Sequence, residues 1–238
     1  MKNALATSLI VAAIAMAAPA IAQTAAAPTS TPDYGSWKVT LGGATDNRSK
    51  DASKSAGDAY IYGNATWTSP SGFFYAAPGF ETIDSSTGSE MEVQAYAGIK
   101  PKFGDLAIDL RAAYKYQTDA NPNTDEDAWE FTGNFTYPVG PAKARLQIQH
   151  SPDGTGGTRA WTWVEGRVAW DVSRKLNASV AVGQREQDNS LDYVGWNAGV
   201  TYAAASNVSL DLRWYGTDGP STNQTYDDEL VAGFVVTF

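Results

Sequence analysis

Thirteen charged side chains of this sequence could act on a solute, because each lies where polar and apolar residues alternate. Eight are basic and five are acidic. Alternation places such residues on one face, where a basic surplus would attract anions and opposite charges would also pair with one another. The thirteen residues are Lys38, Glu92, Asp109, Arg111, Lys115, Glu130, Lys143, Arg145, Glu165, Arg167, Arg185, Asp211 and Arg213.

Hydrolytic or metal chemistry has little support in the sequence. His150 is the only histidine, and Ser151 follows it directly, so in a strand the two side chains would point to opposite faces. A nucleophile and its base must lie within hydrogen-bonding reach. There is no cysteine, and the acidic run 125–127 lacks the twelve-residue order of a calcium loop. We therefore predict no enzymatic activity, no catalytic residue, no metal site and no cofactor.

The elements that carry the charged residues are predicted to be short β-strands. In "LAIDLRAAYKY" (residues 106–116), apolar residues occupy every second position and charged residues fall between them. This period of two indicates a strand with two unlike faces. Ten further segments show the same pattern, and "GFFYAAPGFETI" is counted as a third strand along the chain, which gives twelve. Pro78 in that strand lacks a backbone donor, so a β-bulge is expected there.

The connections between these strands alternate in length. Short turns such as "SPSG" and "PVGP" alternate with long polar segments at 46–58, 84–90, 118–127, 151–159, 186–192 and 216–228. This asymmetry is typical of a transmembrane antiparallel β-barrel with short periplasmic turns and longer external loops. The last strand would pair with the first to close the barrel, ending at Phe238. Phe238 is predicted to be the C-terminal signal for the barrel-assembly machinery. A water-soluble β-sandwich is the alternative fold.

The first residues predict export. Lys2 precedes an apolar stretch, and the small residues Ala20 and Ala22 stand just before Gln23. This pattern indicates a signal peptide over residues 1–22, with a membrane anchor as the alternative. Residues 23–35 would form a flexible periplasmic stub and residues 36–238 the barrel. The formal net charge of −9 argues against nucleic acid as a partner. The acidic loops are predicted to be solvated, or to bridge divalent cations to lipopolysaccharide phosphates.

Three stretches resemble the TorF porin family of proteobacteria: "ATDNRSKDASKSAGDAYIYGNATW", "SGFFYAAPGFETI" and "GDLAIDLRAAYKY". The resemblance covers nearly all of the chain after residue 22 and implies an outer-membrane barrel with a porin role. Together with the alternating charges, it predicts a channel for passive diffusion of small solutes, anions among them, surrounded by lipid and lipopolysaccharide. A plugged structural or receptor-like barrel is the alternative. An autotransporter-like translocator is disfavoured because only a short segment precedes the first strand.

Overall fold

The structure of the protein is a computed structural model that describes residues 33–220 and 222–238. Tyr34–Phe238 forms one compact unit. The predicted signal peptide at residues 1–22 and most of the predicted stub lie outside the described residues. In the described part of the chain, no helix is long and apolar enough to cross a membrane.

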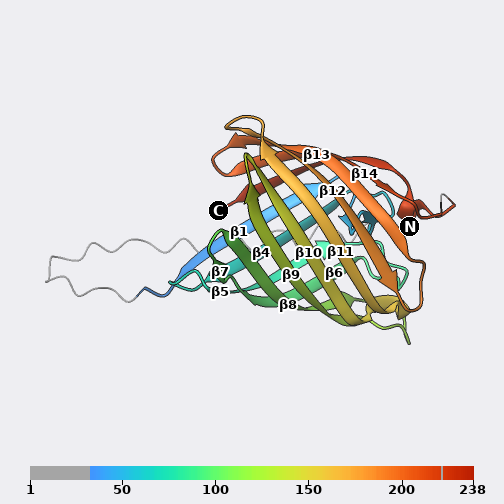
Figure 1. The fold of residues 1–238 in the computed structure, drawn as a ribbon. Coiled ribbons are helices and arrows are strands. Elements are labelled where there is room, and N and C mark those ends of the chain that lie inside the picture. Colours follow the sequence, from blue (N-terminus) through green and yellow to red (C-terminus); the bar gives the residue numbers. More distant parts are fainter. Residues whose placement is uncertain (1–32, 221) are drawn as a thin grey trace, which may run out of the picture. The chain divides into compact units, whose positions relative to one another are not determined.

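Twelve long strands form a closed transmembrane antiparallel β-barrel, as the alternating pattern predicted (Figure 1). Each strand pairs with its neighbours in sequence order around the ring. The strands are β1 (Ser36–Ala44), β4 (Tyr60–Thr68), β5 (Phe74–Thr82), β6 (Met91–Ile99), β8 (Leu106–Thr118), β9 (Asp127–Val139), β10 (Ala142–Gly154), β11 (Arg159–Asp171), β12 (Leu176–Gln187), β13 (Tyr193–Ala205), β14 (Val208–Thr217) and β15 (Glu229–Thr237).

The chain closes on itself through its last residue. β1 and β15 pair in antiparallel register, from Thr40 opposite Thr237 to Ala44 opposite Gly233. Beyond that ladder, the Val39 amide donates to the Phe238 carbonyl at 3.1 Å, and the Phe238 amide donates to the Val39 carbonyl at 2.9 Å. Barrel closure leaves no open sheet edge, which a hydrocarbon environment requires.

The outer face of the barrel is apolar because one side chain in two points away from the interior. Leu110, Trp129, Phe131 and Phe234 are all exposed, and the charged residues between them are far less accessible. Water would disfavour so many exposed large apolar side chains, whereas lipid solvates them. The outer face is therefore the lipid-facing one.

The remaining elements are small and lie in the connections. β7 (Lys102–Phe103) pairs with the start of β8, while β2 (Arg48–Ser49) and β3 (Ala52–Ser53) form a separate hairpin. Two single-turn 3₁₀ helices, η1 (Thr155–Gly157) and η2 (Gln224–Tyr226), lie in loops at the same end as that hairpin. The short turns lie at the other end of the barrel. Ser36, where the first strand begins, and Thr237, where the last strand ends, lie there too.

The predicted bulge at Pro78 is absent. Asn64 pairs with Gly79 and Trp67 with Ala76 in one unbroken register, so no residue has been inserted. The ladder between β4 and β5 is only interrupted at Ala77 and Pro78, while Pro78 still lies opposite Ala95 of β6. Proline has no backbone N–H to donate, so the ladder toward β4 is broken near Pro78. The paired residues before and after this gap keep the register, and no bulge forms.

Four of the predicted external loops are shorter than expected, and the one at 151–159 differs most. Most of the predicted loop at 151–159 belongs to β10 and β11, which continue to Gly154 and from Arg159, with a register shift between Ser151 and Gly154. The loop predicted at 186–192 begins only after Gln187. Strands can project beyond the lipid with polar residues on both faces, so the end of apolar alternation does not mark the end of pairing.

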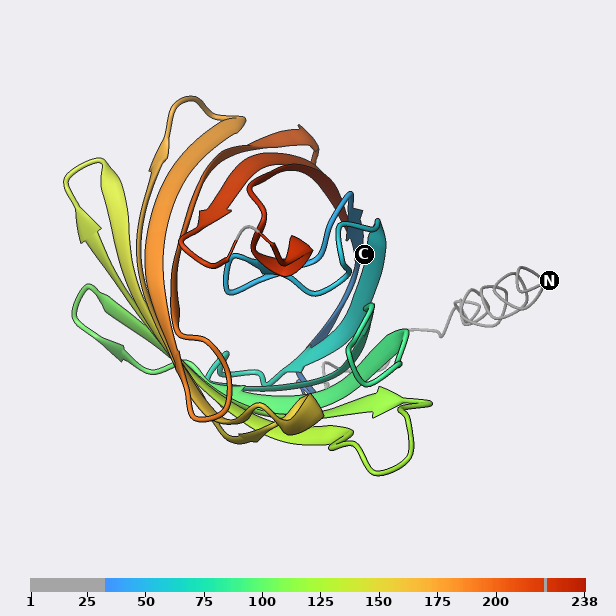
Figure 2. The same ribbon diagram turned by 90° about the vertical axis from the view of Figure 1, so that its right-hand side faces the viewer.

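The first long connection, residues 45–59 and here called L1, runs into the barrel instead of outward. Figure 2 views the ring along its bore and shows L1 and the segment containing η2 inside it. Asp46, Asn47, Asp51, Ser53 and Ser55 of L1 are all buried. L1 carries the β2–β3 hairpin, so the structure places a polar hairpin within the barrel.

Candidate functional site

The tip of L1 is a two-residue turn in an unusual conformation. Arg48 pairs with Ser53 and Ser49 with Ala52, which leaves Lys50 and Asp51 as the turn. Both have positive φ values, 57° and 64°. Hairpin turns with two such residues favour Asn-Gly, and each non-glycine residue held in a sparsely populated conformation costs about 1–3 kcal/mol. Contacts elsewhere must therefore hold this tip in place.

The base of L1 is built around one buried carboxylate. Asp46 accepts hydrogen bonds from the hydroxyls of Ser53 at 2.7 Å and Ser55 at 2.8 Å. It also forms an ion pair with Arg48. Arg48 in turn donates to the Asp227 carbonyl at 2.8 Å, which connects L1 to the last external loop. Because these groups satisfy one another, a polar loop can remain inside the barrel.

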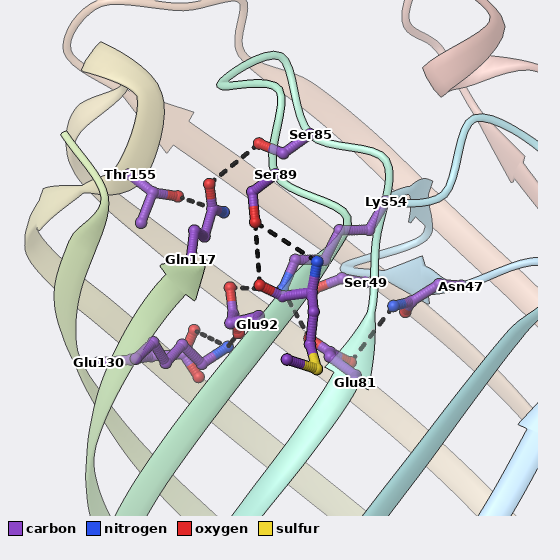
Figure 3. Close-up of polar contacts among 12 residues, drawn as sticks. Asn47, Ser49, Lys54, Glu81, Ser85, Ser89, Glu92, Gln117, Glu130 and Thr155 are labelled. Carbon is purple, nitrogen blue, oxygen red and sulfur yellow. Dashed lines mark hydrogen bonds and ion pairs between the residues drawn. The ribbon is translucent and has the colours of Figure 1, made fainter. Parts of the chain in front are cut away.

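A chain of alternating charges holds L1 against one side of the wall (Figure 3). Lys54 bridges Glu81 of β5 at 2.6 Å and Glu92 of β6 at 2.8 Å. Lys115 of β8 bridges Glu92 at 3.3 Å and Glu130 of β9 at 3.5 Å. Lys50 at the tip reaches Glu130 at 3.3 Å. Two lysines of L1 and one of the wall are thus shared among three carboxylates.

The tip also contacts the far side of the barrel. The Asn197 side chain of β13 donates to Asp51 at 2.7 Å, and the Tyr193 hydroxyl donates to the Lys50 carbonyl at 2.8 Å. Around the ring, β13 is separated from β5 by four strands in one direction and by six in the other. L1 therefore reaches nearly opposite walls and lies across the bore.

Burial changes the protonation of both tip residues. Burial, followed by repulsion from Lys115, Arg185 and Lys54, lowers the pKa of Lys50 to about 7, although Glu130 opposes this shift. Burial raises the pKa of Asp51 to about 6, against the hydrogen bond from Asn197. Both residues belong to L1, which connects β1 to β4, and not to a membrane-spanning strand. The charge of the L1 tip therefore changes near neutral pH.

The interior wall carries further charge clusters. Glu165 of β11 contacts Arg145 at 2.5 Å and Arg167 at 3.1 Å. Asp211 pairs with Arg213 at 3.2 Å, and Arg213 also donates to Asn197 at 3.0 Å. Because Glu165 pairs with two arginines and can neutralise only one of them, its cluster keeps an excess of positive charge.

Two more of the thirteen predicted residues join this network. The Tyr75 hydroxyl donates to Asp109 at 2.5 Å. Arg111 lies over the Tyr96 ring at 5.2 Å and contacts Glu130 at 3.6 Å. By contrast, Lys38 and Lys143 are exposed and form no ion pair with the residues that the structure describes.

The residues of L1 and Glu81 were not among the predicted site residues. The polarity of L1 and its position between two alternating segments predict an external loop. One feature of the sequence distinguishes L1: it carries three basic residues, Arg48, Lys50 and Lys54, which balance its three aspartates, whereas most other long loops are acidic. Basic residues in a loop beside strands that carry glutamates are the signal that could have indicated its position.

His150 and Ser151 point in opposite directions, as predicted. His150 is exposed, and its Nδ1 atom lies 3.0 Å from the Thr162 hydroxyl. Ser151 is fully buried, and its hydroxyl donates to the Asp153 carbonyl at 2.8 Å. The two side chains are therefore not arranged as a nucleophile and its base.

A glycine of β13 permits the close approach of L1, and its substitution gives a test. A Cβ atom on Gly195 would lie 2.6 Å from the Cβ atom of Asp51. We expect Gly195→Ala to displace the tip and to lower the free energy of unfolding by about 1–3 kcal/mol, measured by urea titration of the refolded protein in detergent. Gly166→Ala is the matched control, because a Cβ there meets nothing within 4 Å. Equal midpoints for the two variants would contradict the packing of L1 on β13.

Comparison with known proteins gives a family and a fold. A family model described as "Bacterial protein of unknown function (Gcw_chp)" matches residues 25–237. No curated protein matches the sequence. Among solved structures, a KdgM porin is 7% identical with a TM-score of 0.58, over 84% of this chain and 99% of that one.

Two further solved structures have the same architecture. A NanC porin is 7% identical with a TM-score of 0.59, over 84% of this chain and 98% of that one. The COG4313 outer membrane channel from Pseudomonas putida F1 is 8% identical with a TM-score of 0.54, over 91% of this chain and all of the channel. At these identities, the three structures speak for the barrel fold and not for a shared solute.

Proposed function

Because this chain belongs to the Gcw_chp family, a bacterial family of unknown function, we propose its function from its own geometry. We infer an outer-membrane channel through which small solutes diffuse passively, with anions preferred over cations. One observation carries the proposal: a closed barrel with an apolar outer face encloses charged side chains among which the basic ones are in excess. The outward apolar residues suit a lipid environment, and the interior charges suit hydrated solutes.

An excess of positive charge appears around two of the interior carboxylates. Glu165 is shared by two arginines, and Glu130 is shared by Lys50, Lys115 and Arg111. Each carboxylate neutralises only one of these cations. In a narrow bore with low-dielectric walls, the remaining positive charge raises the local concentration of anions. Selectivity requires neither a cofactor nor a catalytic group.

The second candidate is a structural or receptor-like barrel that does not conduct. L1 favours it, because the loop reaches nearly opposite walls and its contacts are largely buried. Two cavities of about 290 Å³ each are lined in part by L1. One is lined by Lys50, Lys54 and Trp161, and the other by Asp46, Tyr60 and Asp211. We favour the channel because these cavities are lined by charged and hydroxyl groups.

Electrical recording separates the two candidates. In planar bilayers under a salt gradient, we expect discrete current steps and a reversal potential that shows anion preference. Arg145→Glu changes its cluster with Glu165 and Arg167 from a net charge of +1 to −1, so it should reduce the anion-to-cation permeability ratio several-fold. Arg174→Glu, in an exposed turn, should shift the ratio much less. Silence from correctly folded, heat-modifiable protein would instead support the plugged barrel.

The cellular setting is part of the same proposal. Export through a cleaved signal peptide, assembly through Phe238, insertion among lipid and lipopolysaccharide, and the relation to TorF porins are proposed from the sequence patterns. A carboxyl-terminal truncation that removes Phe238 also removes its two hydrogen bonds to Val39, so reduced recovery in the outer membrane fraction would agree with both assembly and closure roles.

A further inference from the structure

Two cations of the interior share one aromatic ring. The Lys50 ammonium lies 4.2 Å from the centre of the Trp161 ring, and the Arg185 guanidinium lies 4.7 Å from it. Lys50 has Glu130 as an ionic partner, but no carboxylate among the described residues lies within ion-pair distance of Arg185. The Arg185 Nε atom is also buried without a hydrogen-bond partner in the described structure. Such a buried donor calls for an explanation.

The charges around the L1 tip do not balance. Glu81, Glu92 and Glu130 are the carboxylates of the network, and its five cations are Lys50, Lys54, Arg111, Lys115 and Arg185. With all of them ionised, two positive charges remain, and the Asp51 carboxylate of the tip, which accepts from Asn197, offsets one of them when it is ionised. Positive charges held together inside a protein are costly unless an anion accompanies them.

This surplus lies beside a partly open cavity. A cavity of about 290 Å³ on the external side of the barrel is lined by Lys50, Arg185 and Trp161, together with Gln117, Tyr193 and Tyr226. The lining also includes serine and threonine hydroxyls from L1 and the neighbouring loops, and the carboxylates of Asp84, Glu92 and Glu130. Its volume is at the lower end of the range for small-molecule sites. The donors suit a carboxylate, and the hydroxyls suit a hydroxylated body.

The conformation of the L1 tip supports a role for Lys50 beyond folding. Lys50 and Asp51 stand in a turn where Asn-Gly would be unstrained, and both have positive φ. The Tyr193 hydroxyl fixes the backbone of Lys50 through its carbonyl. Backbone strain that persists at such a position is commonly associated with function.

We propose that Lys50 and Arg185 form a binding site for a small organic anion with one carboxylate and a hydroxylated body, at the external side of L1. The anion would accept charge-assisted hydrogen bonds from both side chains and would neutralise part of the surplus. The site deepens the proposed channel function and rests on it only for its physiological meaning: it is where an anionic solute would pause before passing L1.

The charge of Lys50 makes this site sensitive to pH. The pKa of Lys50 lies at about 7, so the side chain is mostly neutral at pH 8 and mostly charged at pH 6. The groups facing it are Glu130 of β9, Lys115 of β8, Arg185 of β12 and Lys54 of L1, with Trp161 of β11 beneath it. The neighbouring Asp51, with a pKa of about 6, loses part of its negative charge as the pH falls from 8 to 6. Both changes favour anion binding at the lower pH.

Calorimetric titration of the refolded protein in detergent tests the site without requiring conductance. The probes are gluconate and, as a neutral molecule of similar size, glucose. We expect saturable binding of gluconate at pH 6, weaker binding at pH 8, and no binding of glucose. Arg185→Gln should weaken gluconate binding about tenfold, as expected for the loss of one charge-assisted hydrogen bond. Arg174→Gln, in an exposed turn, should leave it unchanged.

Arg185→Lys protects the test against a folding defect, because it keeps the charge and should retain most of the affinity. Glucose binding equal to that of gluconate, or an Arg185→Gln variant that folds and binds normally, would overturn the site. The result is independent of the channel: gluconate binding by a protein that does not conduct supports the site and refutes the channel. Conductance without gluconate binding does the reverse.

Discussion

Deletion of residues 48–53 should raise the single-channel conductance by on the order of threefold, because it removes the hairpin that lies across the bore. The flanking parts of L1 are long enough to be rejoined by two glycines. The measurement is the step size in a planar bilayer at symmetrical salt concentration. If the intact protein is silent, the same deletion should produce steps where none existed.

A second variant separates the hairpin from its side chains. Lys50→Asn with Asp51→Gly keeps a two-residue turn, and it gives that turn the residues that its backbone prefers. It removes the contacts to Glu130 and Asn197. An increase in conductance close to that of the deletion would mean that these contacts hold L1 in the bore. Unchanged conductance in both variants would show that L1 does not limit the passage of ions.

Glu130→Ala should destabilise the protein by about 3–5 kcal/mol, the cost of removing one partner from a buried ionic network. Glu130 is 3% exposed and contacts Lys50, Lys115 and Arg111. Without it, three cations face one another with only Glu92 nearby as compensation for Lys115. The free energy of unfolding, from urea titration in detergent, is the measurement.

Glu186→Ala is the control for this prediction, because Glu186 is exposed at the end of β12. It should change the unfolding free energy by less than about 0.5 kcal/mol. The double variant Glu130→Ala with Lys50→Ala should recover part of the loss, because it removes one of the unmatched charges. A loss below about 1 kcal/mol for Glu130→Ala alone would show that water, and not the carboxylate, solvates these cations.

Local sequence patterns were enough to predict the barrel. In a strand between lipid and a polar interior, alternate residues have different solvents, so "LAIDLRAAYKY" in β8 shows its two faces without reference to any other part of the chain. Closure followed from the same pattern, since the apolar alternation continues to Phe238 and the structure pairs that residue with Val39. The interior position of Glu92 and Glu130 came from this periodicity as well.

The partners of those charges were decided only by the tertiary structure. Lys50 and Glu130 are 80 residues apart, and Asp51 and Asn197 are 146 apart. No periodic pattern relates a loop to the wall against which it folds, so the sequence predicts an external position for L1. Its burial depends on many polar groups being satisfied at the same time, which is a property of the assembled barrel and not of any one segment. The sequence by itself determined a charged interior, and the folding of L1 into that interior determined which charges are neutralised and which remain.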